Sequence, residues 1–160
     1  MVSTLSNAVQ WWTGVYANHA VLRTAVSFAH IGGLVGGGGC AIAADYTALV
    51  LSPESSLART AHLEGLRRTH TAVIAGLVLL LVSGLLLLAA DLETYLSSRI
   101  FWLKMALVAG LLVNGVAVTL AERQARVRQD GWSRLRRVSV VSVALWFLTT
   151  LLGAALPNIG

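Results

Sequence analysis

Four long apolar runs, separated by short polar links, dominate the chain. They cover residues 25–44, 71–90, 100–120 and 138–156. A helix needs about 20 residues to cross about 30 Å of hydrocarbon, and each run has this length. The pattern therefore predicts an all-α membrane protein, a single domain formed by a bundle of four transmembrane helices. Pro157 is expected to end the fourth helix, because proline cannot continue one.

Two segments outside these runs are also expected to be helical. Ser52 suits the N-cap and Pro53 the first position of a helix, so residues 53–70 are interpreted as a cytoplasmic stem that leads into the second span. The N-terminal stretch carries Trp11 and Trp12. Because aromatic rings favour the headgroup level, this stretch is expected to form a helix in the outer interface.

The composition supports a membrane location. Hydrophobic residues make up 56% of the chain and charged residues 12%, with a mean hydropathy of +0.74. Soluble domains carry about 25% charged residues, so this chain has too few to cover a surface in water. The lone Cys40 excludes an internal disulfide and a cysteine-cluster metal site. The sequence has no phosphate loop or dinucleotide fingerprint, and we expect no independent catalytic activity.

The arginines are concentrated in two of the links. Six lie between the third and fourth runs and three between the first and second, whereas the opposite side offers Arg23, Arg99 and Lys104. The positive-inside rule predicts that both arginine-rich links face the cytoplasm and both termini face outward. The net charge of +5 then suits an anionic membrane surface. We expect the lipid bilayer as a partner, and no nucleic acid.

The first run has an unusual surface of small residues. They recur at every fourth position in two neighbouring rows, and such rows let another helix backbone approach closely. We interpret them as a packing face for another helix of the chain or another subunit; room for a flat cofactor is the alternative. The rows are Ala29, Gly33, Gly37, Ala41 and Gly32, Gly36, Cys40, Ala44.

His30 is the candidate cofactor ligand of the first span. Ionisable side chains inside a span are costly and are functional candidates by default. Gly37 lies on the same helix face two turns further along, an arrangement compatible with b-type haem, in which imidazole binds iron and glycine leaves room for the porphyrin. His70 and His19 are the candidates for a second ligand. His30 and His70 are expected to differ by more than about 10 Å in depth, which disfavours one haem bridged by both.

The histidines also form a candidate metal set. His30, His62 and His70 are the possible ligands, and a carboxylate could come from Asp45 or Glu64. The spacing matches no recognised metal motif. We prefer to interpret His62 and His70 as polar residues of the membrane interface.

The third span carries two polar side chains in apolar surroundings. Lys104 lies near the outer end and is expected to extend its ammonium group to the interface; pairing with Asp91 or Glu93, or with an anionic ligand near His30, is the alternative. An amide in mid-span such as Asn114 is expected to form a hydrogen bond to another helix. Hydroxyls such as that of Thr149 are expected to bond to their own helix backbone.

Several short motifs point to a family. They are, in order, Phe28-Ala29-His30-Ile31-Gly32-Gly33-Leu34, Asp45, Ser83-Gly84-Leu85-Leu86-Leu87-Leu88-Ala89-Ala90-Asp91, Phe101-Trp102-Leu103-Lys104-Met105 and Asn114-Gly115. From the first span through the third, their order resembles a bacterial family of four-helix integral membrane proteins of unknown function. The first and third helices are more faintly similar to copper-resistance D-type membrane domains and haem-associated small membrane proteins. The resemblance implies the four-helix topology and a bacterial inner membrane. It singles out His30, Asp45, Lys104 and Asn114, and it supplies no activity.

Three functions are consistent with these patterns. The first, which we favour from the sequence, is an accessory subunit or homo-oligomer in a bacterial membrane complex, associating through the glycine-rich face of the first span. The second is a b-type haem or quinone electron-transfer protein with His30 as a ligand. The third is a carrier or channel for a small ligand, with Lys104, His30 and Asn114 lining its path.

Overall fold

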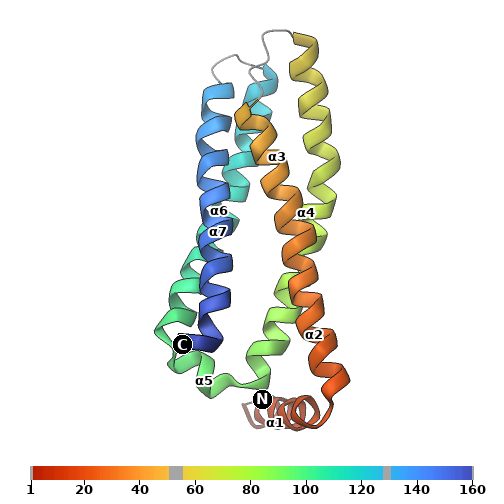
Figure 1. The fold of residues 1–160 in the computed structure, drawn as a ribbon, viewed down its shortest axis with the longest axis vertical. Helices are drawn as coiled ribbons and strands as arrows, with labels where there is room; N and C mark the ends of the chain where they lie inside the picture. Colours follow the sequence, from red (N-terminus) through yellow and green to blue (C-terminus); the bar gives the residue numbers. More distant parts are fainter. Residues whose placement is uncertain (1, 51–55, 128–130, 160) are drawn as a thin grey trace.

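The protein is all-α, as predicted. A computed structural model describes residues 2–50, 56–127 and 131–159 (Figure 1). These residues form helices almost throughout. The helices are α1 (Val2–Asn18), α2 (Ala20–Gly33), the π-helical segment η1 (Leu34–Gly38), α3 (Gly39–Val50), α4 (Ser56–Ala90), α5 (Leu92–Ser97), α6 (Arg99–Val127) and α7 (Gly131–Ile159).

Four of these helical stretches are long and apolar enough to cross a membrane, which confirms the predicted bundle. The first combines α2, η1 and α3 into one stretch, Ala20–Val50, and the others lie in α4, α6 and α7. Figure 1 shows them side by side, with both chain termini at one end of the bundle and α1 lying across that end. We call this end the terminal end. The opposite one, where α3 and α6 end and α7 begins, is the link end.

The bundle consists of two helix pairs. The stretch from α2 to α3 packs along α4, and α6 packs along α7. The pairs meet mainly where α3 packs on α7, so the buried hydrophobic core lies at the link end. The core residues are Ala48, Ala121, Ala125, Trp132 and Leu135.

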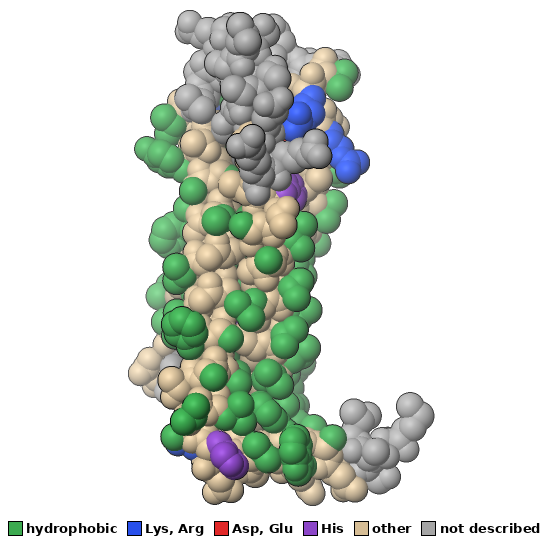
Figure 2. All heavy atoms as spheres, turned by 90° about the vertical axis from the view of Figure 1, so that its right-hand side faces the viewer, with side chains coloured by type: hydrophobic (Ala, Val, Ile, Leu, Met, Phe, Trp, Pro, Cys, Tyr) green, Lys and Arg blue, Asp and Glu red, His purple; other side chains and the backbone are tan. Residues whose placement is uncertain are grey.

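The lateral surface is apolar. Large hydrophobic side chains such as Phe28, Val113 and Phe147 are 75%, 70% and 63% exposed. On the face in Figure 2, hydrophobic side chains extend along the bundle, whereas the visible Lys, Arg and His side chains lie toward its two ends. Because a bilayer is apolar between its headgroup layers, this distribution suits a protein embedded in lipid.

Helix boundaries differ from the prediction in several places. The first span is helical over Ala20–Val50, where 25–44 was predicted. The helix α6 continues seven residues beyond the expected end at residue 120, to Val127. The helix α7 begins at Gly131 and continues through Pro157 to Ile159, so the expectation that this proline ends the helix is wrong. Proline removes a single backbone hydrogen bond there, in the last turn, where the loss is small. The proposed cap at Ser52 and Pro53 lies outside the described residues.

One row of small residues in the first span closes a tight helix–helix contact. A Cβ atom on Gly37 would lie 2.8 Å from the Cα atom of Gly76 in α4, and one on Gly33 would lie 3.0 Å from the Gly76 carbonyl oxygen. We call this contact of Gly33, Gly37 and Gly76 the glycine seam. A Cβ atom on Gly32 or Gly36, in the second row, would meet no atom within 4 Å. Within the chain, the interpretation as a packing face therefore holds for the first row of small residues, and not for Gly32 and Gly36 of the second row.

Candidate functional site

A pocket of about 300 Å³ lies in the link-end half, between α3, α4, α6 and α7. Its wall is mostly apolar, but seven polar side chains converge on it from all four helices. We call it the acidic pocket. The seven are Asp45, Thr69, His70, Thr119, Glu122, Ser139 and Ser142.

Asp45 is the most secluded charged group of the pocket. It is 6% exposed and lies at the end of the first apolar run, where α3 packs on α7. The hydroxyls of Ser142 and Ser139 face its carboxylate. Ser139 is fully buried, and its hydroxyl makes no hydrogen bond of acceptable geometry. Among the described residues, Asp45 forms no ion pair with a basic side chain. A carboxylate in an apolar layer without a cationic partner is costly.

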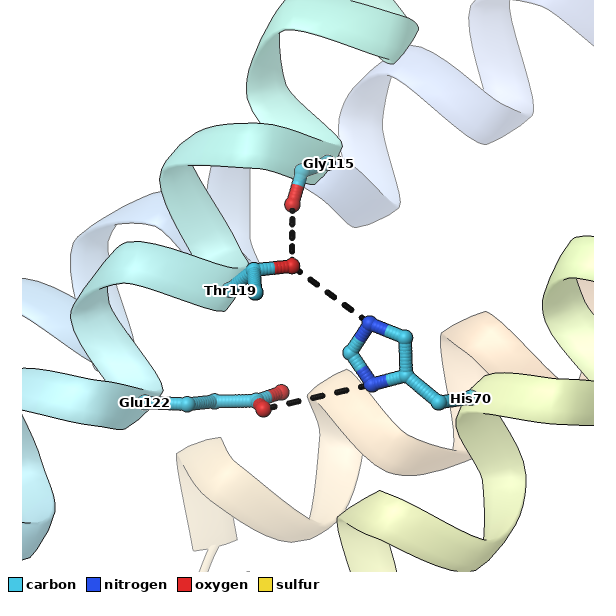
Figure 3. Close-up of polar contacts among 4 residues, drawn as sticks. All are labelled: His70, Gly115, Thr119 and Glu122. Atoms are coloured by element: carbon cyan, nitrogen blue, oxygen red, sulfur yellow. Dashed lines mark hydrogen bonds and ion pairs between the residues drawn. The ribbon is translucent and has the colours of Figure 1, made fainter.

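His70 bridges α4 and α6 through two contacts, which Figure 3 shows. Its Nε2 atom lies 3.4 Å from the Thr119 hydroxyl, and that hydroxyl donates to the Gly115 carbonyl oxygen at 3.0 Å. Because the hydroxyl proton is engaged with Gly115, the Thr119 oxygen accepts from Nε2–H. The Nδ1 atom then faces Glu122, 4.0 Å from its Oε2 atom. Two groups that titrate in water therefore face each other across the pocket.

Glu122 lies within the electrostatic reach of three other groups. It is 8% exposed, and its charge interacts with those of His70, Arg126 and Asp45. Arg126 lies one turn beyond Glu122 on α6 and does not line the pocket. The lining of the pocket thus contains two carboxylates and one histidine, and no lysine or arginine among the described residues.

An indole ring completes the pocket on the side of α7. Trp146 is 4% exposed and lines the cavity. It packs on the π-helical segment: a Cβ atom on Gly38 would lie 3.0 Å from its ring. A larger residue at position 38 would push the ring aside, so η1 sets its position.

His30 lies in the other half of the bundle and forms a closed polar contact. Its Nδ1 atom is 3.0 Å from the Ser83 hydroxyl oxygen, and that hydroxyl donates to the Leu79 carbonyl at 2.6 Å. The Ser83 oxygen therefore accepts from Nδ1–H. Gly84 leaves room for the imidazole, since a Cβ atom there would lie 3.3 Å from its Cε1 atom.

The structure does not bring the candidate haem ligands together. His30 contacts Ser83, and His70 lies on α4 itself. Positions 70 and 83 are thirteen residues apart on α4, which corresponds to a rise of about 20 Å. The room expected beside Gly37 is filled by the backbone of Gly76. His19 lies exposed between α1 and α2, with Nδ1 2.8 Å from the Val15 carbonyl oxygen.

The candidate metal set is not assembled either. Among the described residues, no group of three or more His, Cys, Asp or Glu side chains could hold a metal ion. His30 and His70 lie in different halves of the bundle, and the side chain of His62 lies outside the described residues. Because the ligands of a metal must meet within about 2 Å of one point, His30 and His70 cannot share an ion.

The two polar residues of the third span, Asn114 and Lys104, make different contacts. Asn114 donates from Nδ2 to the Val138 carbonyl oxygen on α7 at 3.1 Å, which confirms the predicted bond between helices. Lys104 is half-buried, and its Nζ atom would lie 3.4 Å from a Cβ atom on Gly153 of α7. It therefore lies against a neighbouring helix. Within the described part of the chain it forms no ion pair with Asp91 or Glu93.

The sequence interpretation missed several groups of the pocket, namely Thr119, Glu122, Ser139 and Trp146. One hydroxyl also departs from expectation. Glu122 follows the apolar run 100–120 and looks from the sequence like part of a link, but α6 continues past it. If the helix is continued past residue 120, the helical repeat places Glu122 on the same face as Thr119, one turn later. This spacing could have indicated that Glu122 faces the bundle. The sequence gives no indication of the role of Ser139, because whether its hydroxyl has a hydrogen-bond partner depends on how the helices pack. The Thr149 hydroxyl was expected to bond to its own helix, but it is buried and finds no partner in the described part of the chain.

No protein-family model, curated protein or solved structure matches the chain. The resemblance to a bacterial four-helix family therefore stays a prediction from the motifs.

Proposed function

We propose that this chain is a membrane-embedded binding protein for a small ligand, of the carrier or channel class, and that the acidic pocket is its binding site. The observation that carries the proposal is a cavity of about 300 Å³ in which Asp45 and Glu122 are both more than nine-tenths buried. Small-ligand sites are typically cavities of about 300–1,000 Å³, mostly apolar, with a few polar groups that fix the ligand. The acidic pocket has this construction.

The arrangement of charges supports a functional role for the pocket. Ionisable groups within a membrane span are expensive and mark sites or pathways. Among the described residues, Asp45 gains no ion pair and the Ser139 hydroxyl gains no hydrogen bond of acceptable geometry, so packing alone does not account for these side chains. Apolar residues at these positions would satisfy the same helix contacts at lower cost.

Filling the pocket tests this function. Gly115 lines the cavity, and Gly36 lies outside it; a Cβ atom on either glycine would meet nothing within 4 Å. We would measure the melting temperature of wild type, Gly115→Leu and Gly36→Leu with phenyltrimethylammonium, benzyl alcohol and benzoate. At least one probe is expected to raise the melting temperature of wild type and Gly36→Leu, but not of Gly115→Leu, because binding stabilises the folded state. If no probe gives an effect that depends on Gly115, the pocket is not a ligand site.

The proposed orientation places the acidic pocket in the cytoplasmic half of a bacterial inner membrane, with both termini outside. The arginine-rich links support it through the positive-inside rule. Thr94 and Ser133 are exposed at opposite ends of the bundle. In a Cys40→Ala background, a membrane-impermeant thiol reagent applied to intact cells should label Thr94→Cys and spare Ser133→Cys. The reverse pattern would invert the topology.

Association with other subunits stays a prediction from the sequence. The second row of small residues supports it, because a Cβ atom on Gly32 or Gly36 would meet no described atom of the chain within 4 Å. The b-type haem hypothesis also stays a prediction. A visible spectrum of the purified protein, before and after reduction with dithionite, is its direct test.

A further inference from the structure

We infer that the ligand of the acidic pocket is a small organic cation with an apolar body, of the aromatic ammonium class. This inference rests on the proposed function and adds the chemical class of the ligand. Two features of the pocket carry it: its uncompensated negative charge and its aromatic wall.

The charge of the pocket favours a cation. Asp45 and Glu122 both line it, their charges interact, and the basic group that faces them from the lining is His70. His70 pairs with Glu122, whereas Asp45 has no ion pair among the described residues. A neutral or anionic ligand would leave the Asp45 carboxylate buried and unpaired, which is unfavourable. A ligand cation would supply the missing partner.

The wall of the pocket favours an apolar, polarisable body. Ala41, Ala44, Leu77 and Leu111 line it together with the Trp146 indole. Tryptophan is the best aromatic partner for a cation, and quaternary ammonium groups are typically recognised by aromatic side chains. Asp45 and Trp146 come from packed neighbours, α3 and α7, and line the same cavity.

The pocket thus combines a buried carboxylate and an indole, which together suit an ammonium group on an apolar ring.

The test is equilibrium binding to the full chain in lipid nanodiscs. Radiolabelled phenyltrimethylammonium is the probe, and benzyl alcohol and benzoate serve as neutral and anionic competitors. We expect the cation to bind, Asp45→Asn to weaken its binding by about 30-fold or more, and Trp146→Phe to weaken it by a few-fold. Glu93→Gln, which changes an exposed carboxylate on α5, should leave binding unchanged. Glu122→Gln is a second removal of pocket charge and should weaken binding too.

The outcomes separate the two proposals. If benzyl alcohol or benzoate binds as tightly as the cation and its binding is lost in Gly115→Leu, the pocket is a ligand site but the inference of a cation is overturned. Equal binding of the cation to wild type, Asp45→Asn and Glu122→Gln would also overturn it. If none of the three probes binds to the wild type, both proposals fail.

Discussion

The glycine seam and the acidic pocket lie between neighbouring parts of the same helices, yet they are built in opposite ways. In the seam, α4 meets the first span at backbone distance, and the nearby His30 and Ser83 have each other as partners. The pocket, which α6 and α7 also line, instead holds about 300 Å³ of space. There, Asp45 has no ion pair and the Ser139 hydroxyl has no well-formed hydrogen bond among the described residues. Polar groups near the seam are satisfied and stabilise the fold, whereas those of the pocket are held at a cost, as is usual for functional sites.

The strongest test of this contrast adds a side chain to each region. Gly76→Leu should lower the free energy of unfolding by at least about 3 kcal/mol, because the new atoms would overlap the backbone of Gly37 and the core cannot expand freely. Gly115→Leu in the pocket should change it by less than about 1 kcal/mol. Unfolding by SDS titration in detergent micelles measures both. Equal effects at the two positions would mean that the pocket is as tightly packed as the seam.

Removing the buried charge should stabilise the protein. Asp45→Asn keeps the shape of the side chain and removes the charged form of a group that has no ion-pair partner among the described residues. We expect the free energy of unfolding of the ligand-free protein to rise by about 1–2 kcal/mol. The same titration measures it, with Glu93→Gln as the control on an exposed carboxylate. A loss of stability would show that Asp45 is a structural residue.

How much of this contrast can be read from the sequence depends on the range of the interactions. The four spans follow from local hydropathy, and the Asn114 bond follows because an amide in mid-span has to find a partner. Gly76 looks ordinary in a leucine-rich run, because its importance comes from Gly37, far away in the chain. Glu122 looks like part of a polar link until α6 is seen to continue.

The haem hypothesis shows the same limit. A histidine and a glycine on one helix face leave two interpretations open, since the sequence does not say what lies opposite them. In the structure, Gly76 fills the space beside Gly37, and Ser83 engages His30. Both partners lie on α4, and the spacing of residues within the first span could not reveal them.

The polar pair beside the seam should contribute modestly to stability. Ser83→Ala removes the oxygen that accepts from His30 and leaves a half-buried imidazole N–H without that acceptor. We expect the free energy of unfolding to fall by about 1 kcal/mol, measured as above. Ser83→Thr keeps the hydroxyl and should recover part of the loss. An unchanged free energy of unfolding in Ser83→Ala would mean that His30 finds another hydrogen-bond partner. The contact between His30 and Ser83 would then not be needed beside the seam.

The smallest expected effect on stability is that of replacing Ser139, the buried serine of the acidic pocket. Ser139→Ala removes a fully buried hydroxyl without a partner, so the ligand-free protein should be unchanged or more stable by up to about 0.5 kcal/mol. The effect thus has the opposite sign to that of Ser83→Ala, although both changes remove one serine hydroxyl from the membrane interior. Paired thermal melts of the two variants against wild type measure the difference. A loss of about 1 kcal/mol or more in Ser139→Ala would show that this hydroxyl bonds to Asp45 in the ligand-free protein, and the pocket would then be satisfied without an occupant.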